Sequence, residues 1–294
     1  MTEIFGVPIQ ALLGQLLIGL INGAFYALLS LGLAVIFGLL NIINFTHGAL
    51  YMMGAFCAYF LLAWGVGYWW ALLIAPIVVG AIGILIERTM LARLYKLDHL
   101  YGLLLTFGLA LIIQGVFRNQ FGSSGLPYRI PDELTGGYNL GFMFLPKYRA
   151  WVILASAVLC ASTWYVIERT KLGAYLRAAT ENRALVQAFG VNVPRMVTLT
   201  YGFGVALAAF AGVMAAPIYN VSPQMGSELI IVVFAVVVIG GMGSILGAIV
   251  TGFGLGVIEG LTKVFFPEAS NTVIFVIMAI VLLVRPAGLF GRRA

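Results

Sequence analysis

Charged side chains are scarce in this chain. Only 9% of its 294 residues are Asp, Glu, Lys or Arg, whereas 62% are hydrophobic. A soluble domain carries about a quarter charged residues, so this composition excludes an ordinary water-exposed surface. The longest stretches without any charged residue are 4–86, 99–117, 150–167, 196–227, 229–258 and 269–284. At about 20 residues per span, they predict an all-α polytopic membrane protein with roughly eight to ten transmembrane helices.

Cysteine and histidine are nearly absent, at two residues each. Cys57 and Cys160 fall in separate apolar stretches, which argues against a disulfide framework or a metal site. The two histidines form no H-E-x-x-H motif, and the chain has no G-x-x-x-x-G-K-[ST] phosphate loop. We therefore expect no catalytic site, no metal site and no cofactor bound by this chain.

The cations that are present gather between the apolar stretches. Eleven of the sixteen lie in 87–98, 168–195 and 285–294, and the other five lie in 118–149 and at Lys263. Cytoplasmic loops of membrane proteins carry an excess of Lys and Arg. We therefore predict that the first three segments, including the C-terminus, are cytoplasmic and that 118–149 is an external loop. This placement accounts for the net charge of +6 without a nucleic-acid partner.

Uncharged polar residues interrupt the first apolar stretch, in the segment GLLNIINFTHGALYMMGA. They are Asn41, Asn44, Thr46, His47 and Gly48. Irregular backbone at membrane depth must have its polar groups satisfied by protein or by a water-filled cavity. We therefore predict a broken or half helix near residues 30–48, and either three full spans plus a half helix or four full spans within 8–86. Asn44 and His47 either cap helix ends at an interface or line a substrate path.

Two further features lie near the C-terminus. The segment VIGGMGSILGA contains Gly240, Gly241 and Gly243, which either end a helix beside the path or allow helices to pack closely. Glu259 stands in the apolar segment GLGVIEG and has no partner that the sequence identifies, so we expect it to reach an interface.

The longest cation-rich segment, RTKLGAYLRAATENRALVQAFGVNVPR at 169–195, carries no catalytic or metal pattern. Apolar residues recur at helical spacing, while Arg177 and Glu181 lie four residues apart on the polar side. With Thr180 as an N-cap and Gly190 as a stop, we predict two short helices. This helical knob either docks on another protein or only sets the membrane topology.

Four segments of the chain also occur in a known family. They are LGLAVIFGLLNIINFTHGALYMMGAF, the knob with its continuation MVTLTYGFGVALAAFAGVMAAP, VIGGMGSILGA and the terminal RPAGLFG. They resemble the permease subunits of bacterial branched-chain amino acid ABC importers of the LivH type. The N-F-x-H-G junction at Asn44–Gly48 is the most specific match, although family members more often carry Ala where this chain has Thr46.

The resemblance implies a single permease domain over residues 1–294, with 169–195 as a cytoplasmic coupling loop. The part AFGVNVPR is similar to the coupling loops of importer permeases, which implies that Ala188, Phe189, Gly190, Val191 and Asn192 meet an ATPase. We add Arg177 and Glu181 from the polar side of the knob. Asn41, Asn44, His47, Gly48 and the three glycines of VIGGMGSILGA are the predicted path or helix-break residues.

The resemblance also implies partners. These are a LivM-like second permease, two ATPase subunits of LivG-like and LivF-like type that use ATP and Mg²⁺, and an external substrate-binding protein, assembled in the bacterial inner membrane. The implied cargo is a branched-chain amino acid, and relatives of this kind also serve urea, short amides or aromatic acids. The alternative functions are a self-sufficient carrier or channel and a membrane-embedded enzyme, and the lack of clustered ionisable residues argues against the enzyme.

Overall fold

The structure of the chain is a computed structural model that describes residues 3–4, 7–40, 43–95 and 97–291. Asn41, a predicted path residue, lies outside these described residues, as do the cations Lys96, Arg292 and Arg293.

The regular structure of the described residues is dominated by helices. The helices are α1 (Ile9–Leu40), α2 (Thr46–Ala63), α3 (Tyr68–Thr89), α4 (His99–Phe121), α5 (Lys147–Arg169), α6 (Lys171–Glu181), α7 (Arg183–Ala188), α8 (Val193–Tyr219), α9 (Met225–Gly240), α10 (Ile245–Phe265) and α11 (Val273–Val284). Short 3-10 turns are η1 (Leu91–Arg93), η2 (Asp132–Leu134) and η3 (Pro267–Ala269). The strands β1 (Glu3–Ile4) and β2 (Val7–Pro8) form one antiparallel pair, and β3 (Gly137–Asn139) and β4 (Phe144–Pro146) form another.

Within the described residues, seven helices are long and apolar enough to cross a membrane, namely α1, α2, α3, α4, α5, α8 and α10. The apolar helices α9 and α11 are shorter. This confirms the all-α polytopic membrane fold. The described part of residues 8–86 holds three helices, so both counts expected for that segment were too high. Of the described residues of the polar group, Asn44 lies in the connection between α1 and α2, and Thr46, His47 and Gly48 form the first turn of α2.

Local sequence explains where several helices begin and end. Asp98 caps α4 by accepting a hydrogen bond from the Leu100 amide at 2.8 Å, and Ser244 caps α10 by accepting one from the Gly247 amide at 3.1 Å. The turn between α2 and α3 uses Gly65 at a φ of 81°, a backbone conformation that glycine adopts without steric cost.

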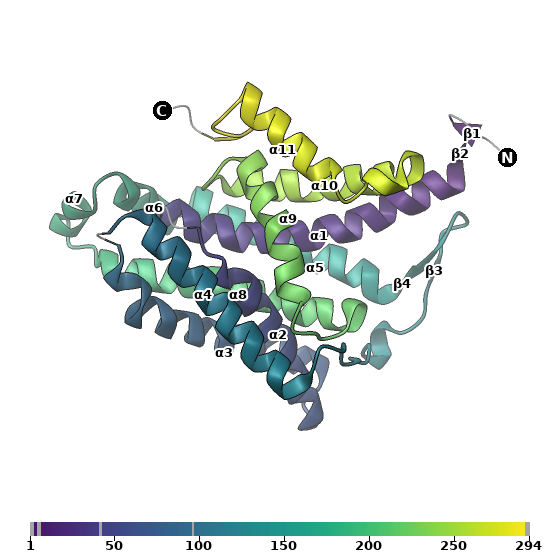
Figure 1. Ribbon diagram of the computed structural model, residues 1–294, viewed down its shortest axis with the longest axis horizontal. Helices are drawn as coiled ribbons and strands as arrows, with labels where there is room; N and C mark the ends of the chain where they lie inside the picture. The colour runs from purple at the N-terminus through teal and green to yellow at the C-terminus, as the bar shows by residue number, and fades with distance from the viewer. Residues whose placement is uncertain (1–2, 5–6, 41–42, 96, 292–294) are drawn as a thin grey trace.

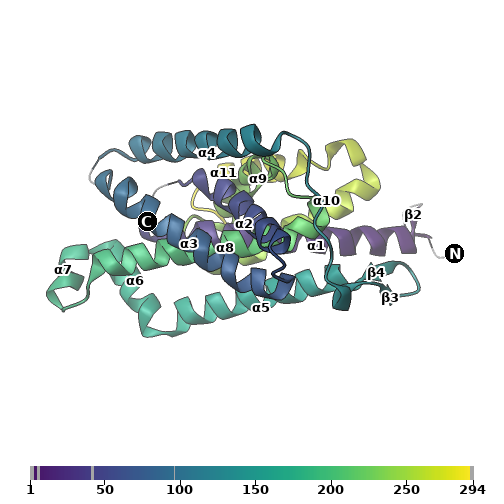
Figure 2. The ribbon, with the colours of Figure 1, turned by 90° about the horizontal axis from the view of Figure 1, so that it is seen from below.

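The long helices lie along the long axis of the molecule, and α9 crosses them steeply (Figure 1). Helix α1 packs most extensively against α10, and α8 packs against α1, α2 and α3. Helices α6 and α7 lie at one end of the molecule and the β3–β4 hairpin lies toward the other end (Figures 1 and 2). Helices α1 and α8 are mostly buried, whereas α4 is mostly exposed.

Small residues bring α1 and α10 into backbone contact. A Cβ atom at Gly256 would lie 2.3 Å from the Cα of Gly23, which is closer than any side chain tolerates. Membrane helices associate through such small residues because lipid supplies no hydrophobic force between them. This contact fixes the position of Glu259, which follows one turn later on α10.

Candidate functional site

The junction between α1 and α2 places two of the predicted residues in the interior. The side chain of Asn44 donates from Nδ2 to the Tyr201 hydroxyl of α8 at 3.0 Å. His47 Nε2 lies 3.1 Å from the Leu29 carbonyl of α1, and because a carbonyl only accepts, Nε2 carries the proton. Both side chains are buried, and neither makes the N-cap hydrogen bond of α2. They contact neighbouring helices and do not cap α2, and their place beside a substrate path stays a prediction.

Each of these two side chains leaves one polar atom without a partner among the described residues. The atoms are Asn44 Oδ1 and His47 Nδ1. Buried polar atoms almost always have a partner, so an unmatched pair at a helix break indicates a place where water or a solute binds. With its proton on Nε2, a neutral His47 offers Nδ1 as an acceptor, and Asn44 Oδ1 is an acceptor as well.

Helix α4 holds the segment between α1 and α2 through Thr106, a residue that no sequence pattern singled out. Its hydroxyl donates to the Ile43 carbonyl at 3.2 Å and accepts from the Phe45 amide at 3.3 Å. Thr46 returns a hydrogen bond to the Thr106 carbonyl at 2.8 Å. Thr46 therefore has a partner for its hydroxyl.

The predicted glycines occupy close helix contacts. Gly48 faces α9, where an added Cβ would lie 2.6 Å from the Gly226 carbonyl oxygen. Gly240 ends α9, and Gly241 and Gly243 follow with φ values of 101° and 82°. The terminal RPAGLFG segment docks on this end of α9, since the Leu289 amide donates to the Ile239 carbonyl at 2.8 Å and the Phe290 amide donates to Gly240 at 3.0 Å. These contacts account for the glycines by packing, and their place beside a path stays a prediction.

Glu259 is buried and paired, although the sequence analysis identified no partner for it. Only 4% of its surface is exposed. It forms an ion pair with Lys263 one turn later at 2.5 Å and accepts from the Tyr26 hydroxyl at 2.7 Å. The amide of Asn22 lies 3.5 Å away and itself accepts from Tyr219 at 3.1 Å. The spacing of four residues to Lys263 was a signal for this pair that the sequence analysis missed, whereas Asn22 and Tyr26 lie on α1, more than two hundred residues away.

The cation-rich segment forms two short helices, α6 and α7, as predicted. Asn182, not Thr180, is the N-cap of α7, because Asn182 Oδ1 accepts from the Leu185 amide at 2.9 Å. Thr180 still belongs to α6 and donates to the Arg177 carbonyl at 2.7 Å. The second helix ends where predicted, with Gly190 just beyond it at a φ of 81°.

The predicted coupling residues differ in their surroundings. Phe189 is 79% exposed at the tip of the knob, and an added Cβ at Gly190 would meet no atom within 4 Å. Arg177 donates to the Ile167 carbonyl of α5 at 2.9 Å and pairs with Glu168 of α5 at 3.4 Å. Asn192 caps α8 by accepting from the Arg195 amide at 3.1 Å. Ala188 is the last residue of α7, and Val191 is half-buried.

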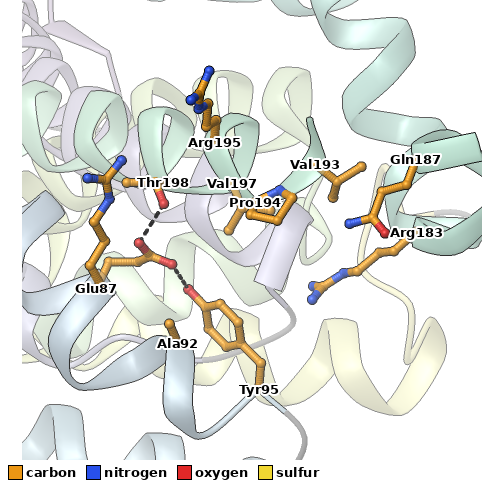
Figure 3. Close-up of a pocket in the computed structure, with 11 residues that line it drawn as sticks. Glu87, Ala92, Tyr95, Arg183, Gln187, Val193, Pro194, Arg195, Val197 and Thr198 are labelled. Atoms are coloured by element: carbon orange, nitrogen blue, oxygen red, sulfur yellow. Dashed lines mark hydrogen bonds between the residues drawn. The ribbon is translucent and has the colours of Figure 1, made fainter. Parts of the chain in front are cut away.

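A pocket of about 410 Å³ lies at the base of the knob, between α3, α7 and α8 (Figure 3). Its floor is Glu87, which is 2% exposed and accepts hydrogen bonds from Tyr95 at 2.6 Å and Thr198 at 2.8 Å. The guanidinium of Arg183 on α7 stacks over the Tyr95 ring at 5.7 Å. Burial, and then the hydrogen bond to Glu87, raise the pKa of Tyr95 above its ordinary value. The knob is therefore linked through Tyr95 and Glu87 to α3 and α8.

Comparison with known proteins gives a consistent result. Residues 15–282 match the family described as "Branched-chain amino acid transport system / permease component". The chain is 30% identical to the high-affinity branched-chain amino acid transport system permease protein LivH of Escherichia coli, over 95% of this chain and 96% of that protein. It is equally 30% identical to the permease protein BraD of Pseudomonas aeruginosa, with the same coverage.

Two more distant likenesses complete the comparison. The permease protein LivM of Escherichia coli is 28% identical over 90% of this chain and 67% of its own length. A solved structure described as PsaBC from Streptococcus pneumoniae in complex with Fab superposes with a TM-score of 0.47 and 14% identity, covering 91% of this chain and 89% of that chain. This last likeness is too low to support a conclusion about the fold.

Proposed function

Because the chain belongs to the family of permease components of branched-chain amino acid transport systems, we propose that it is the membrane-spanning subunit of an ATP-driven importer for branched-chain amino acids. The observation that carries this proposal is the extent of the family match, which covers residues 15–282 of a polytopic helical chain. Leucine, isoleucine and valine are the proposed cargo, and urea, short amides or aromatic acids are the alternatives within the same family resemblance.

The proposed assembly has five protein components besides the cargo. This chain pairs with a LivM-like permease in the inner membrane, and its own similarity to LivM supports a pair of related permeases. Two ATPase subunits, LivG-like and LivF-like, bind and hydrolyse ATP with Mg²⁺ on the cytoplasmic side. A binding protein delivers the amino acid from outside. This chain is then a transport subunit that performs no chemical step.

The coupling role of 169–195 is supported by its shape. Phe189 is 79% exposed at the end of α7, and Leu185 on the same helix is 55% exposed, so the knob offers apolar surface that a partner could cover. Gly190 leaves open space beside Phe189. We propose that Phe189 and Gly190 enter a groove on an ATPase subunit. The remaining coupling residues are Arg177, Glu181, Ala188, Val191 and Asn192.

We propose that the junction between α1 and α2 borders the path of the substrate. The acceptors Asn44 Oδ1 and His47 Nδ1 support this, because both are buried and available for a donor. Gly48 and the group of Gly240, Gly241 and Gly243 would let the helices around the path approach each other closely. Movement of the knob would reach this region through α8, which carries both Thr198 and Tyr201.

Reconstitution tests this function. Vesicles containing this chain, the second permease and both ATPases are expected to accumulate labelled leucine only when ATP and the binding protein are present. A carrier would instead transport leucine in vesicles that contain this chain alone. Uptake by the chain alone, without ATP, would contradict the importer and support the alternative function of a self-sufficient carrier or channel.

A further inference from the structure

A polar cavity of about 260 Å³ lies between α1, α2, the end of α8 and the start of α9. Drug-sized ligands occupy pockets of roughly 300 Å³ or more, so this cavity suits a smaller solute. The adjoining residue Val221 pairs with Leu126, which follows α4. The cavity thus lies toward the end of the molecule opposite the knob, which is the external end in the predicted topology.

Tyr51 is the first observation that indicates a ligand. Its side chain lines the cavity from α2 and is 1% exposed. Its hydroxyl is buried and has no hydrogen-bond partner among the described residues. A buried hydroxyl without a partner costs free energy, and a bound solute that accepts a hydrogen bond removes this cost.

Glu228 is the second observation. It lies in the first turn of α9 and contributes an exposed carboxylate to the same cavity. The other acid nearby, Glu259, is already neutralised by Lys263, whereas the ion pairs within the described residues do not include Glu228. The cavity therefore has one negative charge available for a cationic group.

The remaining wall decides which cationic group fits. Phe25, Met225 and Leu229 line the cavity with apolar surface, and Ser222 adds a second hydroxyl. Tyr26 and Tyr219 also line the cavity, but their hydroxyls already donate to Glu259 and Asn22. The carboxylate of Glu228, the two other hydroxyls and the apolar wall match the three parts of an amino acid that has an aliphatic side chain. The ammonium suits Glu228, the carboxylate suits hydroxyl donors, and the side chain suits the apolar wall.

We propose that this cavity is a transit site that holds an aliphatic amino acid as its zwitterion, with Glu228 binding the ammonium and Tyr51 and Ser222 donating hydrogen bonds to the carboxylate. The proposal rests on the proposed function, since it assumes that an amino acid enters from the external side. It assigns to this chain a direct part in substrate recognition, in addition to that of the binding protein.

Protection of a cysteine tests the site. In the complete purified assembly, Cys57 and Cys160 are replaced by Ala and Leu229→Cys supplies a thiol in the cavity wall. Labelling by a membrane-impermeant maleimide is then measured with leucine, with 4-methylpentanoate, which lacks the ammonium, and with isoamylamine, which lacks the carboxylate. Leucine at about ten times its dissociation constant is expected to slow labelling about ten-fold, because only the unoccupied fraction reacts. Each analogue is expected to protect more weakly.

Near-isosteric variants identify the groups responsible. Glu228→Gln is expected to raise the half-protecting leucine concentration by about ten-fold or more, since a charge-assisted hydrogen bond is lost. Tyr51→Phe should also weaken protection. The matched controls are Glu268→Gln, an exposed acid outside the cavity, and Tyr128→Phe, which removes another buried hydroxyl without a partner. Both controls should protect like the parent, and co-purification of the partner subunits verifies assembly in each case.

Two outcomes would overturn the transit site while leaving the proposed function intact. The first is a parent assembly that imports leucine with ATP and binding protein but shows no protection. The second is equal protection in Glu228→Gln and Glu268→Gln. If the thiol proves unreactive, Leu229→Trp fills the cavity and is expected to reduce leucine uptake, and uptake at the parent rate would again overturn the site. A parent that imports no leucine contradicts the proposed function itself.

Discussion

The buried polar side chains of this protein fall into two groups, those with hydrogen-bond partners and those with an unpartnered atom. Glu87 and Glu259 each have a partner nearby in sequence (Tyr95 and Lys263) and another more than a hundred residues away (Thr198 and Tyr26). Asn44, His47 and Tyr51 instead present buried atoms without partners in the described structure. Satisfied groups fix helices in place, whereas unsatisfied ones provide positions for water or solute. The first group predicts effects on stability and the second predicts effects on transport.

Tyr95→Phe belongs to the first group. The change removes the donor to one carboxylate oxygen of the buried Glu87, so we expect a loss of about 1–3 kcal/mol in the free energy of unfolding. Burial raises the pKa of Tyr95, so its proton is present at neutral pH and the loss should not change between mildly acidic and mildly alkaline buffer. Thermal unfolding of the purified assembly measures it. The exposed Tyr101→Phe is the control, and equal midpoints for the two variants would show that the Tyr95 hydrogen bond does not contribute to stability.

Asn44→Leu belongs to the second group. We expect uptake to fall about ten-fold, the value of one hydrogen bond to a buried solute, while membrane insertion and assembly stay nearly normal. Tyr201→Phe is the comparison, because it removes the hydrogen bond between these two residues and keeps the Asn44 amide. Similar uptake in both variants would show that Asn44 acts only through its hydrogen bond with Tyr201. Failed insertion of Asn44→Leu would also indicate a structural role.

Several helices are positioned by backbone contacts at glycines, where there is no room for a side chain. The contact of α1 with α10 sets Glu259 beside Tyr26, and that of α2 with α9 borders the junction after α1. At the other end of the molecule, the α7–α8 connection leaves Phe189 and Gly190 open to a partner. Packing fixes the α1–α10 and α2–α9 contacts. Within the described residues, the α7–α8 connection has no such contact at Phe189 and Gly190, and we expect a docking partner to supply it.

Gly256→Ala and Gly254→Ala separate helix contact from helix propensity. An added Cβ at Gly256 meets the α1 backbone at 2.3 Å, whereas one at Gly254 meets nothing within 4 Å. We expect Gly256→Ala to lower the unfolding midpoint of the assembly. Gly254→Ala should leave it unchanged or raise it slightly, because Ala favours a helix by about 1 kcal/mol over Gly. Equal midpoints would show that α1 and α10 can separate without cost.

Gly190→Arg tests the coupling element. A bulky cation at the tip of the knob should block docking, so substrate-stimulated ATP hydrolysis and uptake should be lost together while the binding protein keeps its affinity for substrate. The control is Gly136→Arg, which has a similar positive φ and open surroundings but lies just before the β3–β4 hairpin. This variant imposes the same backbone strain away from the knob. If Gly190→Arg retains both the ATPase subunits and stimulated hydrolysis, the knob only sets topology.

The molecule as a whole has two chemically different ends. The knob carries Arg177, Arg183 and Arg195, and the opposite end carries the β3–β4 hairpin and the cavity lined by Tyr51 and Glu228. Lipid-spanning helices join the two ends. This arrangement fits a subunit that receives solute at one face and a mechanical input at the other.

Cysteine labelling tests this orientation. In a background without Cys57 and Cys160, Ser124→Cys and Asn182→Cys are expected to react with an impermeant maleimide from opposite faces of the membrane, because the eleven-to-five distribution of cations assigns the knob to the cytoplasm. Sealed cells should label Ser124→Cys, and Asn182→Cys should label only after the membrane is opened. Labelling of both positions in sealed cells would refute the topology.

The sequence by itself determined the solvent, the helical class and the family of this protein. Composition and the long uncharged stretches decide the first two, because such stretches are stable in lipid only as helices whose backbone polar groups are satisfied internally. The family follows from the four matching segments. It also located the two knob helices and the interruption before α2. The spacing of apolar residues and the end of α7 before Gly190 depend only on residues that are close together in the sequence.

Only the tertiary structure decided which polar groups meet. Glu259 lies beside Tyr26, Asn44 beside Tyr201, and Glu87 beside Thr198, and each pair is separated by more than one hundred residues. The N-cap of α7 was also missed, because Thr180 and Asn182 are both capping residues and the continuation of α6 through Glu181 selects between them. A transmembrane helix has apolar residues on all sides, so its sequence does not show which face is buried. That face is decided by close packing against other helices, which the sequence does not identify.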